Sequence, residues 1–227
     1  MNPIDYRDFA ALARRHCGKC VLFARHAERP NLPPDDPSYG VNLPITDAGR
    51  EMALQCGRDL RKAAPASEWS FWSSSLLRAR LTAAAVAEGV GVPSPVIHDS
   101  VEAGVPGRWW YTSPDLVFKG YQTEGNSNYN DRYFREGSVP GYLPLGESAR
   151  LTLEWLRDFD FGSRLAFVAS HDVFVAILLQ GIGVRRFRSS QWVGFVQAAG
   201  LLFSPDGSFR AYYCVPDKSD YQASALA

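Results

Sequence analysis

The chain has 227 residues, enough for one sizeable α/β domain with its own core. Apolar residues make up 46% of it and the formal net charge is zero, which excludes wholesale disorder and argues against a nucleic-acid binder. No stretch reaches the roughly 18 apolar residues of a membrane span, and residues 1–15 lack the apolar core of a secretory signal, so we expect a soluble, cytoplasmic protein that binds neither membrane nor nucleic acid.

Helical and strand patterns alternate along most of the chain. In chain order we expect a helix over 4–15, a strand over 20–24, a loop over 30–45, a helix over 46–64, a strand over 69–72, a helix from Ser73–Ser75 to Gly89, a strand over 96–98, a helix over 146–159, a strand over 165–169, a helix over 173–180 and a hairpin of 198–204 with 208–215. The runs 20–24 and 165–169 are continuously apolar, as in strands buried on both faces of a parallel sheet. The sequence therefore predicts a three-layer α/β fold whose mainly parallel sheet carries helices on both faces.

The segment 103–146 differs from the rest because it is rich in Gly, Pro, Asn, Tyr and Trp and has little periodicity. We expect a single domain over 1–227 with an irregular, cap-like insertion at about 103–146. Its aromatic side chains, among them Trp109, Trp110 and Tyr121, indicate order. They would stack on a sugar or base of a substrate or, as we prefer, pack the cap itself.

The four cysteines are too few and too scattered for a disulfide scaffold. Cys17 and Cys20 form a CxxC pair beside His16, but no second ligand pair has zinc-site spacing. We therefore expect no metal there, and interpret Cys20 as the start of a buried strand.

Polar residues gather where three of the predicted strands end. They are Arg25-His26, Ser73-Ser74-Ser75 with Arg78 one helical turn on, and Ser170-His171-Asp172, and Arg29 follows the first group. Ligands of open α/β sheets bind outside the carboxyl ends of the strands, so these groups should converge. Arginine forks and a helix N-terminus suit phosphate oxygens, while one histidine attacks phosphorus and the other binds an oxygen as it gains charge. The pattern predicts phosphoryl transfer.

Several segments together resemble the histidine phosphatase (phosphoglycerate-mutase-like) superfamily. The motifs, in family order from about residue 20 to 180, are Leu22–Arg29 with Arg25-His26, Leu43–Gly49, Ser74–Ala83, Gly146-Glu147-Ser148 and Ser170-His171-Asp172. The resemblance implies that His26 is the nucleophile that becomes phosphorylated, that Arg25, Arg78 and His171 hold the phosphoryl oxygens, and that no cofactor or metal takes part. Ala27 stands in place of the usual Gly and Ser75 in place of the usual Pro.

Two further roles follow from the resemblance with alternatives open. Arg29 resembles the extra phosphate-binding arginine of the acid-phosphatase members, although Pro30 follows it directly. The proton donor is either Glu102, as in mutase-like members, or Asp172, as in acid-phosphatase members, and the compact chain favours Glu102. One of the two carboxylates would then only orient an arginine or cap a helix, a role for which Asp172 is well placed.

The function expected is that of a phosphomonoesterase acting on a small phosphorylated metabolite through phosphohistidine 26. A phosphoglycerate-mutase-type phosphotransferase is the first alternative, and a non-catalytic protein that binds a phospholigand is the second. A metal hydrolase using both histidines is disfavoured because the neighbouring arginines would repel a cation. The sequence indicates no oligomeric state.

Overall fold

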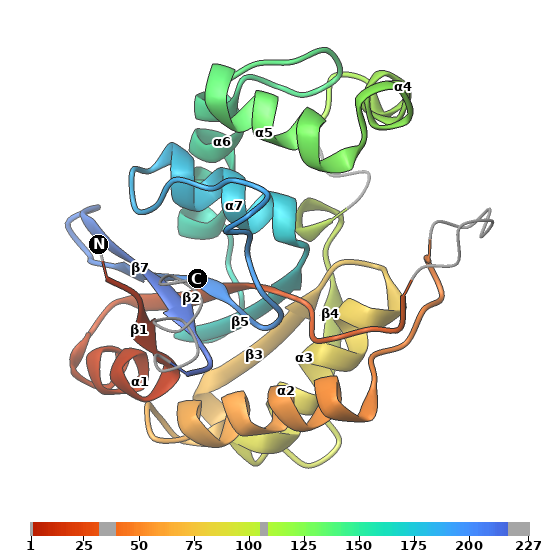
Figure 1. Ribbon diagram of the computed structural model, residues 1–227. Helices are drawn as coiled ribbons and strands as arrows, with labels where there is room; N and C mark the ends of the chain where they lie inside the picture. The colour runs from red at the N-terminus through yellow and green to blue at the C-terminus, as the bar shows by residue number, and fades with distance from the viewer. Residues whose placement is uncertain (1, 32–39, 105–108, 218–227) are drawn as a thin grey trace.

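The computed structural model describes residues 2–31, 40–104 and 109–217, so parts of the predicted loop 30–45 and of the insertion lie outside it. The described strands form one sheet in the order β1-β7-β6-β2-β5-β3-β4 (Figure 1). The strands are β1 (Ile4–Asp5), β2 (Lys19–Arg25), β3 (Trp69–Ser73), β4 (Ile97–Asp99), β5 (Leu165–Ser170), β6 (Ala198–Phe203) and β7 (Phe209–Val215). The helices are α1 (Tyr6–Arg15), α2 (Asp47–Leu60), α3 (Leu77–Val90), α4 (Pro114–Glu124), α5 (Asn126–Glu136), α6 (Leu145–Asp158) and α7 (Asp172–Gly181), with 3-10 turns η1 (Ala66–Glu68) and η2 (Val101–Ala103).

The carboxyl ends of the three central strands β2, β5 and β3 lie at the same edge of the sheet. Strand β5 runs parallel to both β2 and β3, pairing Arg25 with Ser170 and Ser73 with Ala169. Strand β6 is antiparallel to both β2 and β7, as the predicted hairpin requires. The predicted meeting of the polar strand ends at one edge of the sheet is therefore present.

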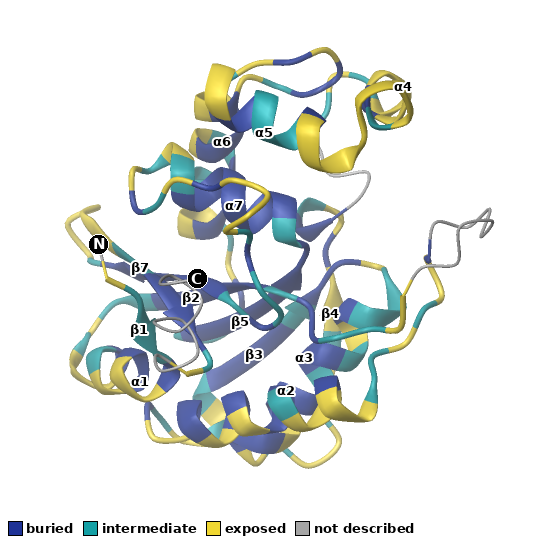
Figure 2. Ribbon diagram, viewed as in Figure 1, coloured by how far each residue is buried: buried dark blue, intermediate teal, exposed yellow. Residues whose placement is uncertain are grey.

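Helices cover both faces of the sheet, as predicted. Along β2 the side chains alternate between faces, so that Val21 and Phe23 pack with α6 and α7 while Cys20 and Leu22 pack with α1, α2 and α3. All four side chains are essentially inaccessible, and the sheet lies dark between the two helical layers in Figure 2. This explains why β2 reads as a continuous apolar run.

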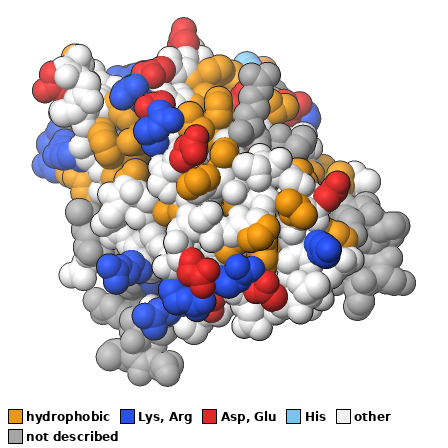
Figure 3. Space-filling model, turned by 90° about the horizontal axis from the view of Figure 1, so that it is seen from above, with side chains coloured by type: hydrophobic (Ala, Val, Ile, Leu, Met, Phe, Trp, Pro, Cys, Tyr) orange, Lys and Arg blue, Asp and Glu red, His pale blue; other side chains and the backbone are white. Residues whose placement is uncertain are grey.

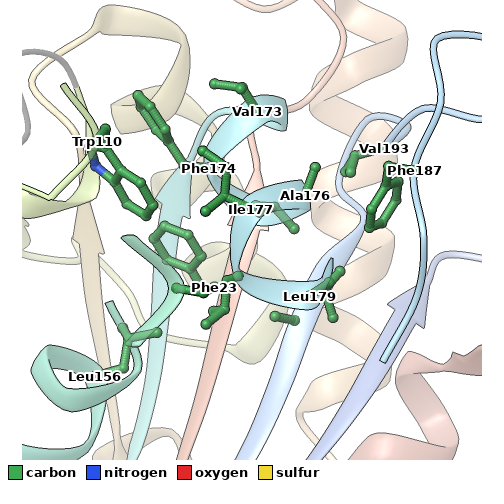
Figure 4. Packing of buried hydrophobic residues seen from close by; sticks show 14 of the residues in the cluster. Phe23, Trp110, Leu156, Val173, Phe174, Ala176, Ile177, Leu179, Phe187 and Val193 are labelled. Carbon is green, nitrogen blue, oxygen red and sulfur yellow. The ribbon is translucent and has the colours of Figure 1, made fainter. Parts of the chain in front are cut away.

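The insertion is anchored to the core through aromatic side chains. Trp110 is fully buried and stacks on Phe174 of α7, with ring centroids 4.4 Å apart, and on Phe23 of β2 at 6.3 Å (Figure 4). Tyr133 and Tyr142 stack at 4.5 Å inside the insertion. These rings pack the cap, as the preferred interpretation held, and Trp110 has no surface left for a substrate.

The prediction of an irregular insertion is wrong, because it contains helices α4 and α5. Ser113 caps α4 and Pro114 stands in its first turn, while Gly125 and Gly137 end α4 and α5 with positive φ. In α5 the helical pattern is hard to recognise because its buried residues are the aromatics Tyr129, Tyr133 and Phe134, and because Asn126 and Asn128, poor helix formers, occupy its first turn. That the whole chain folds as a single domain stays a prediction. Within the described residues no helix is long and apolar enough to cross a membrane.

Candidate active site

The two histidines meet at the carboxyl edge of the sheet. The backbone of His26 continues the ladder by donating to Ser170 O at 2.9 Å, and Ser74 N donates to Ala169 O at 2.9 Å. His26 and His171 are 4% and 6% exposed, and their ring centroids lie 5.5 Å apart. Helix α3 begins at Leu77 rather than at the serines, so the Ser73–Ser75 stretch forms the end of β3 and the turn that follows it.

The tautomer of His26 follows from its hydrogen bonds. Its Nδ1 lies 2.8 Å from Ala27 O, and because a carbonyl only accepts, Nδ1 carries the proton. Its Nε2 accepts from Arg78 Nε at 3.1 Å and therefore bears the lone pair. Burial is the main cause that lowers the pKa of His26 below its usual 6.5, and Arg78 and Arg25 add to it against the Ala27 bond. His26 is thus a neutral base whose Nε2 faces an arginine.

Ser74 holds the second histidine from the β3 side. Its Oγ lies 2.9 Å from His171 Nε2. Burial, followed by the charges of His26 and the nearby arginines, lowers the pKa of His171 well below 6.5, so this ring is also neutral. Gly104 packs on the pair so closely that an added Cβ would lie 2.3 Å from Ser74 Cβ and 3.4 Å from His171 Nε2.

Arg25 is fixed by three contacts. Its Nη1 donates to Val193 O at 2.5 Å, its Nη2 lies 3.2 Å from Asp172 Oδ2, and its guanidinium stacks 4.2 Å from the Phe195 ring centroid. Its buried Nε finds no hydrogen-bond partner among the described residues. A guanidinium held in this way keeps donors for an anion at the strand ends.

Arg78 and Arg29 add positive charge to the same edge. Besides its bond to His26, Arg78 donates from Nη1 to Gly40 O at 2.6 Å. Burial, then the charge of Arg29, lowers the pKa of Arg78 to about 10. Arg29 is half-buried, donates to Pro30 O at 2.7 Å and also lowers the pKa of Arg25. All three arginines predicted to bind phosphate are therefore within electrostatic reach of one another.

Asp172 is the more tightly held of the two candidate carboxylates. Besides Arg25, it accepts from Val173 N at 2.8 Å and from the Trp192 side chain. Burial raises the pKa of Asp172, but Arg25, the Val173 amide and His26 outweigh it and hold the pKa below the usual range. Asp172 thus contacts Arg25 and the amide of Val173, but it is the first residue of α7 and not its cap, since His171 occupies the N-cap position.

Glu102 belongs to a segment that reaches the histidine pair through Gly104. It belongs to η2, accepts from Ser100 Oγ at 3.0 Å and stands two residues before Gly104, which touches Ser74. The start of α2 also lies close to the site, because Thr46 Oγ1 donates at 3.0 Å to Glu28, which follows His26 by two residues.

Sequence reasoning missed the loop between α7 and β6. Besides Val193 and Phe195, Val196 N donates to His26 O at 3.4 Å while Val196 has φ +58°, a strained value for a β-branched residue. The Gln197 side chain fastens this loop by accepting from Gly194 N at 2.6 Å and from the Tyr213 hydroxyl. Only the isolated Gly194 hinted at a turn here, and nothing in the local pattern pointed to Arg25.

Metal ligands do not gather in the described part of the chain. No group of three His, Cys, Asp or Glu side chains there could hold an ion, and the four cysteines are unpaired. Cys20 is buried in β2 and Cys17 is exposed just before it, as the structural interpretation of the CxxC pair predicted.

A doubly wound sheet with two histidines at its carboxyl edge defines a phosphoglycerate-mutase-like α/β protein. The chain belongs to the histidine phosphatase superfamily (branch 1), whose family model matches residues 21–183. The resemblance and the fold class inferred from the sequence are thus confirmed.

Solved structures share this fold across almost their whole length. Phosphoglycerate mutase from Bacillus anthracis has a TM-score of 0.54 at 14% identity, covering 94% of this chain and 99% of its own. Mycobacterial glucosyl-3-phosphoglycerate phosphatase has a TM-score of 0.51 at 15% identity, covering 87% and 98%. Mycobacterial hydrolase 2 has a TM-score of 0.50 at 13% identity, covering 92% and 96%. The comparison with curated proteins gives no match.

Proposed function

We propose that the protein is a phosphomonoesterase that hydrolyses a small phosphorylated metabolite through a phosphohistidine on His26. The observation that carries the proposal is the neutral His26 ring, whose Nε2 lone pair points to Arg78 Nε at 3.1 Å. An imidazole held in this tautomer is a ready nucleophile, and the arginine beside it is a ready partner for the phosphoryl group.

In the first step Nε2 of His26 attacks phosphorus and the P–O bond to the leaving alcohol breaks. The bond from Nδ1–H to Ala27 O stabilises the positive charge that the ring gains. The Arg78 Nε that contacts Nε2 in the free protein then contacts a phosphoryl oxygen, and Arg25 and Arg29 neutralise the remaining charge.

His171 stabilises the transferring group without changing its own charge. Its pKa lies well below 6.5, so the ring is neutral and carries one proton. In this proposal the Ser74 hydroxyl donates to Nε2, so that Nδ1 of His171 carries the proton and donates it to a non-bridging oxygen as that oxygen gains charge.

Glu102 is the proton donor in this proposal. Asp172 is ionised and committed to Arg25, so it is poorly suited to deliver a proton. Among the described residues, Glu102 accepts a hydrogen bond from the neutral hydroxyl of Ser100, and it stands two residues before Gly104, which contacts Ser74. Protonated Glu102 gives its proton to the leaving alkoxide, and the resulting carboxylate takes a proton from the water that attacks phosphohistidine.

Product analysis with wild type, His26→Ala and Arg58→Ala, an exposed arginine on α2, tests this proposal. A panel of alkyl and sugar phosphates should release inorganic phosphate with wild type and Arg58→Ala, and His26→Ala should lose on the order of 10⁴-fold or more in kcat. Isomerised ester without free phosphate would instead identify a phosphotransferase. Phosphate-ester binding without turnover would identify a binding protein, and either result overturns the proposal.

A further inference from the structure

A second anion-attracting cavity lies at the far end of α7. It has a volume of about 1240 Å³ and is lined by the end of α5, the start of α6 and residues 180–191. Helix α7 begins at Asp172 beside the catalytic edge and is ten residues long, ending at Gly181. At about 1.5 Å per residue the helix separates the cavity from His171 by roughly 15 Å. Figure 1 shows the loop that follows α7, to the left of the helix, and residues of this loop line the cavity.

The lining of the cavity has a strong excess of positive charge. It contains four arginines, which are Arg135, Arg185, Arg186 and Arg188, and a single carboxylate, Asp131. Both oxygens of Asp131 are engaged, because they accept from Ser189 N at 2.6 Å and from Ser189 Oγ at 2.7 Å. Exposed Arg186 and Arg188 make no ion pair with a described residue.

This excess stands out in a chain whose net charge is zero. On the face that Figure 3 shows, several groups of Lys and Arg side chains lie next to acidic ones. Arg135 follows this rule, since it pairs with Glu136 at 2.8 Å. Arg186 and Arg188 have no such ion pair with a described residue, so these two exposed guanidinium groups form an anion-attracting spot at the cavity.

The arginine run is held in place by its surroundings. Gln180 donates to Phe134 O at 2.6 Å and accepts from Phe187 N at 2.8 Å. The Arg185 guanidinium lies 5.4 Å from the Phe187 ring centroid and 4.9 Å from that of Tyr213. Asp131 also holds Ser189 against α5, so the backbone that carries the arginines is fixed before a ligand binds.

From this geometry we propose that the cavity binds a small polyanion that carries at least two phosphate groups. Guanidinium forks match phosphate oxygens bidentately, and the volume accommodates several such groups. The described lining holds no histidine, cysteine or hydroxyl group, so the site binds its ligand and does not transform it. The same segment continues into Trp192 and Val193, which contact Asp172 and Arg25, so the ligand contacts the loop that orders the catalytic arginine.

Calorimetric titration of the full chain with tripolyphosphate tests the proposal, in the His26→Ala background so that the probe is not turned over. We expect one molecule bound per chain, with affinity that falls as salt is added. Arg186→Ala/Arg188→Ala should weaken binding about tenfold or more, whereas Arg150→Ala/Arg157→Ala, which removes two exposed arginines of α6, should not.

Three outcomes would overturn the proposal. The first is no binding of tripolyphosphate, and the second is equal weakening by the two double variants, which would reflect net charge alone. The third is loss of binding on Arg78→Ala, which would place the probe in the catalytic pocket. Circular dichroism of each variant separates a lost site from a lost fold.

Discussion

Replacing Glu102 and Asp172 one at a time tests which carboxylate donates the proton and which one only positions Arg25. Glu102→Gln keeps the side-chain shape and its acceptance from Ser100 but removes the proton. For an alkyl phosphate the leaving oxygen needs that proton, so kcat should fall by about 10²–10⁴-fold. With 2,4-dinitrophenyl phosphate, whose phenolate leaves unprotonated, the rate at which the same variant releases phenolate in its first turnover should stay within a few-fold of wild type.

Asp172→Asn should behave differently because its effect passes through Arg25. The ion pair spans 3.2 Å, and the side chains of Arg25 and Asp172 are 16% and 33% exposed, so solvent screens it in part. Losing it should cost about 1–2 kcal/mol, or roughly five- to thirtyfold in kcat/KM, equally for both substrates. Leaving-group dependence in Asp172→Asn and its absence in Glu102→Gln would refute the assignment, and Glu88→Gln, an exposed pair partner of Arg50, is the control.

Other predictions concern the supports of the site. Gly104→Ala should lower kcat at least about tenfold, because the added carbon would displace Ser74, and assays of kcat beside melting curves would contradict this if both matched wild type. Gln197→Ala should weaken inhibition by orthovanadate about tenfold, because it loosens the loop that holds Arg25. Gln197→Glu keeps the acceptor oxygen and should therefore be inhibited almost as strongly as wild type. The pKa values of His26 and His171 lie below 6.5 in the folded state, so only the unfolded chain gains these protons as the pH falls. Calorimetry should therefore show Tm falling from about pH 7.5 to pH 5, with a smaller fall in a variant that carries Gln at both positions; equal falls would contradict the burial of these rings.

Most of the sheet could be predicted because its centre is buried on both faces. The apolar runs of β2 and β5 leave little choice of structure, and a polar residue at their ends is costly unless the strand stops there. This is why Arg25, His26 and His171 could be placed at one edge before any contact was known.

The helices of the insertion were missed because few of their buried side chains are aliphatic. In α5, Tyr129, Tyr133 and Phe134 are buried, but polar residues fill the positions between them and an uncapped start follows Gly125. Tertiary packing of tyrosines, rather than local propensity, selects the helix.

The loop before β6 was missed for a different reason. Val193 contributes a backbone carbonyl, and Val196 contributes an amide in a conformation that valine rarely adopts. Backbone groups carry no residue signature, so a sequence cannot reveal that they hold Arg25 and His26. The ion pair between Arg25 and Asp172 joins residues that lie far apart in the sequence, so the choice between Glu102 and Asp172 as proposed proton donor needed the structure.

Rapid acid-free quenching followed by 31P NMR and peptide mapping tests the central claim most directly. Wild type mixed with a phosphate ester should carry one phosphoryl group on His26, bonded to Nε2. Glu102→Gln should accumulate it from 2,4-dinitrophenyl phosphate, because the phenolate leaves without a proton while the attack of water is slowed. Phosphate on Nδ1, phosphate on His171, or a turning-over enzyme that never carries phosphohistidine would contradict the account.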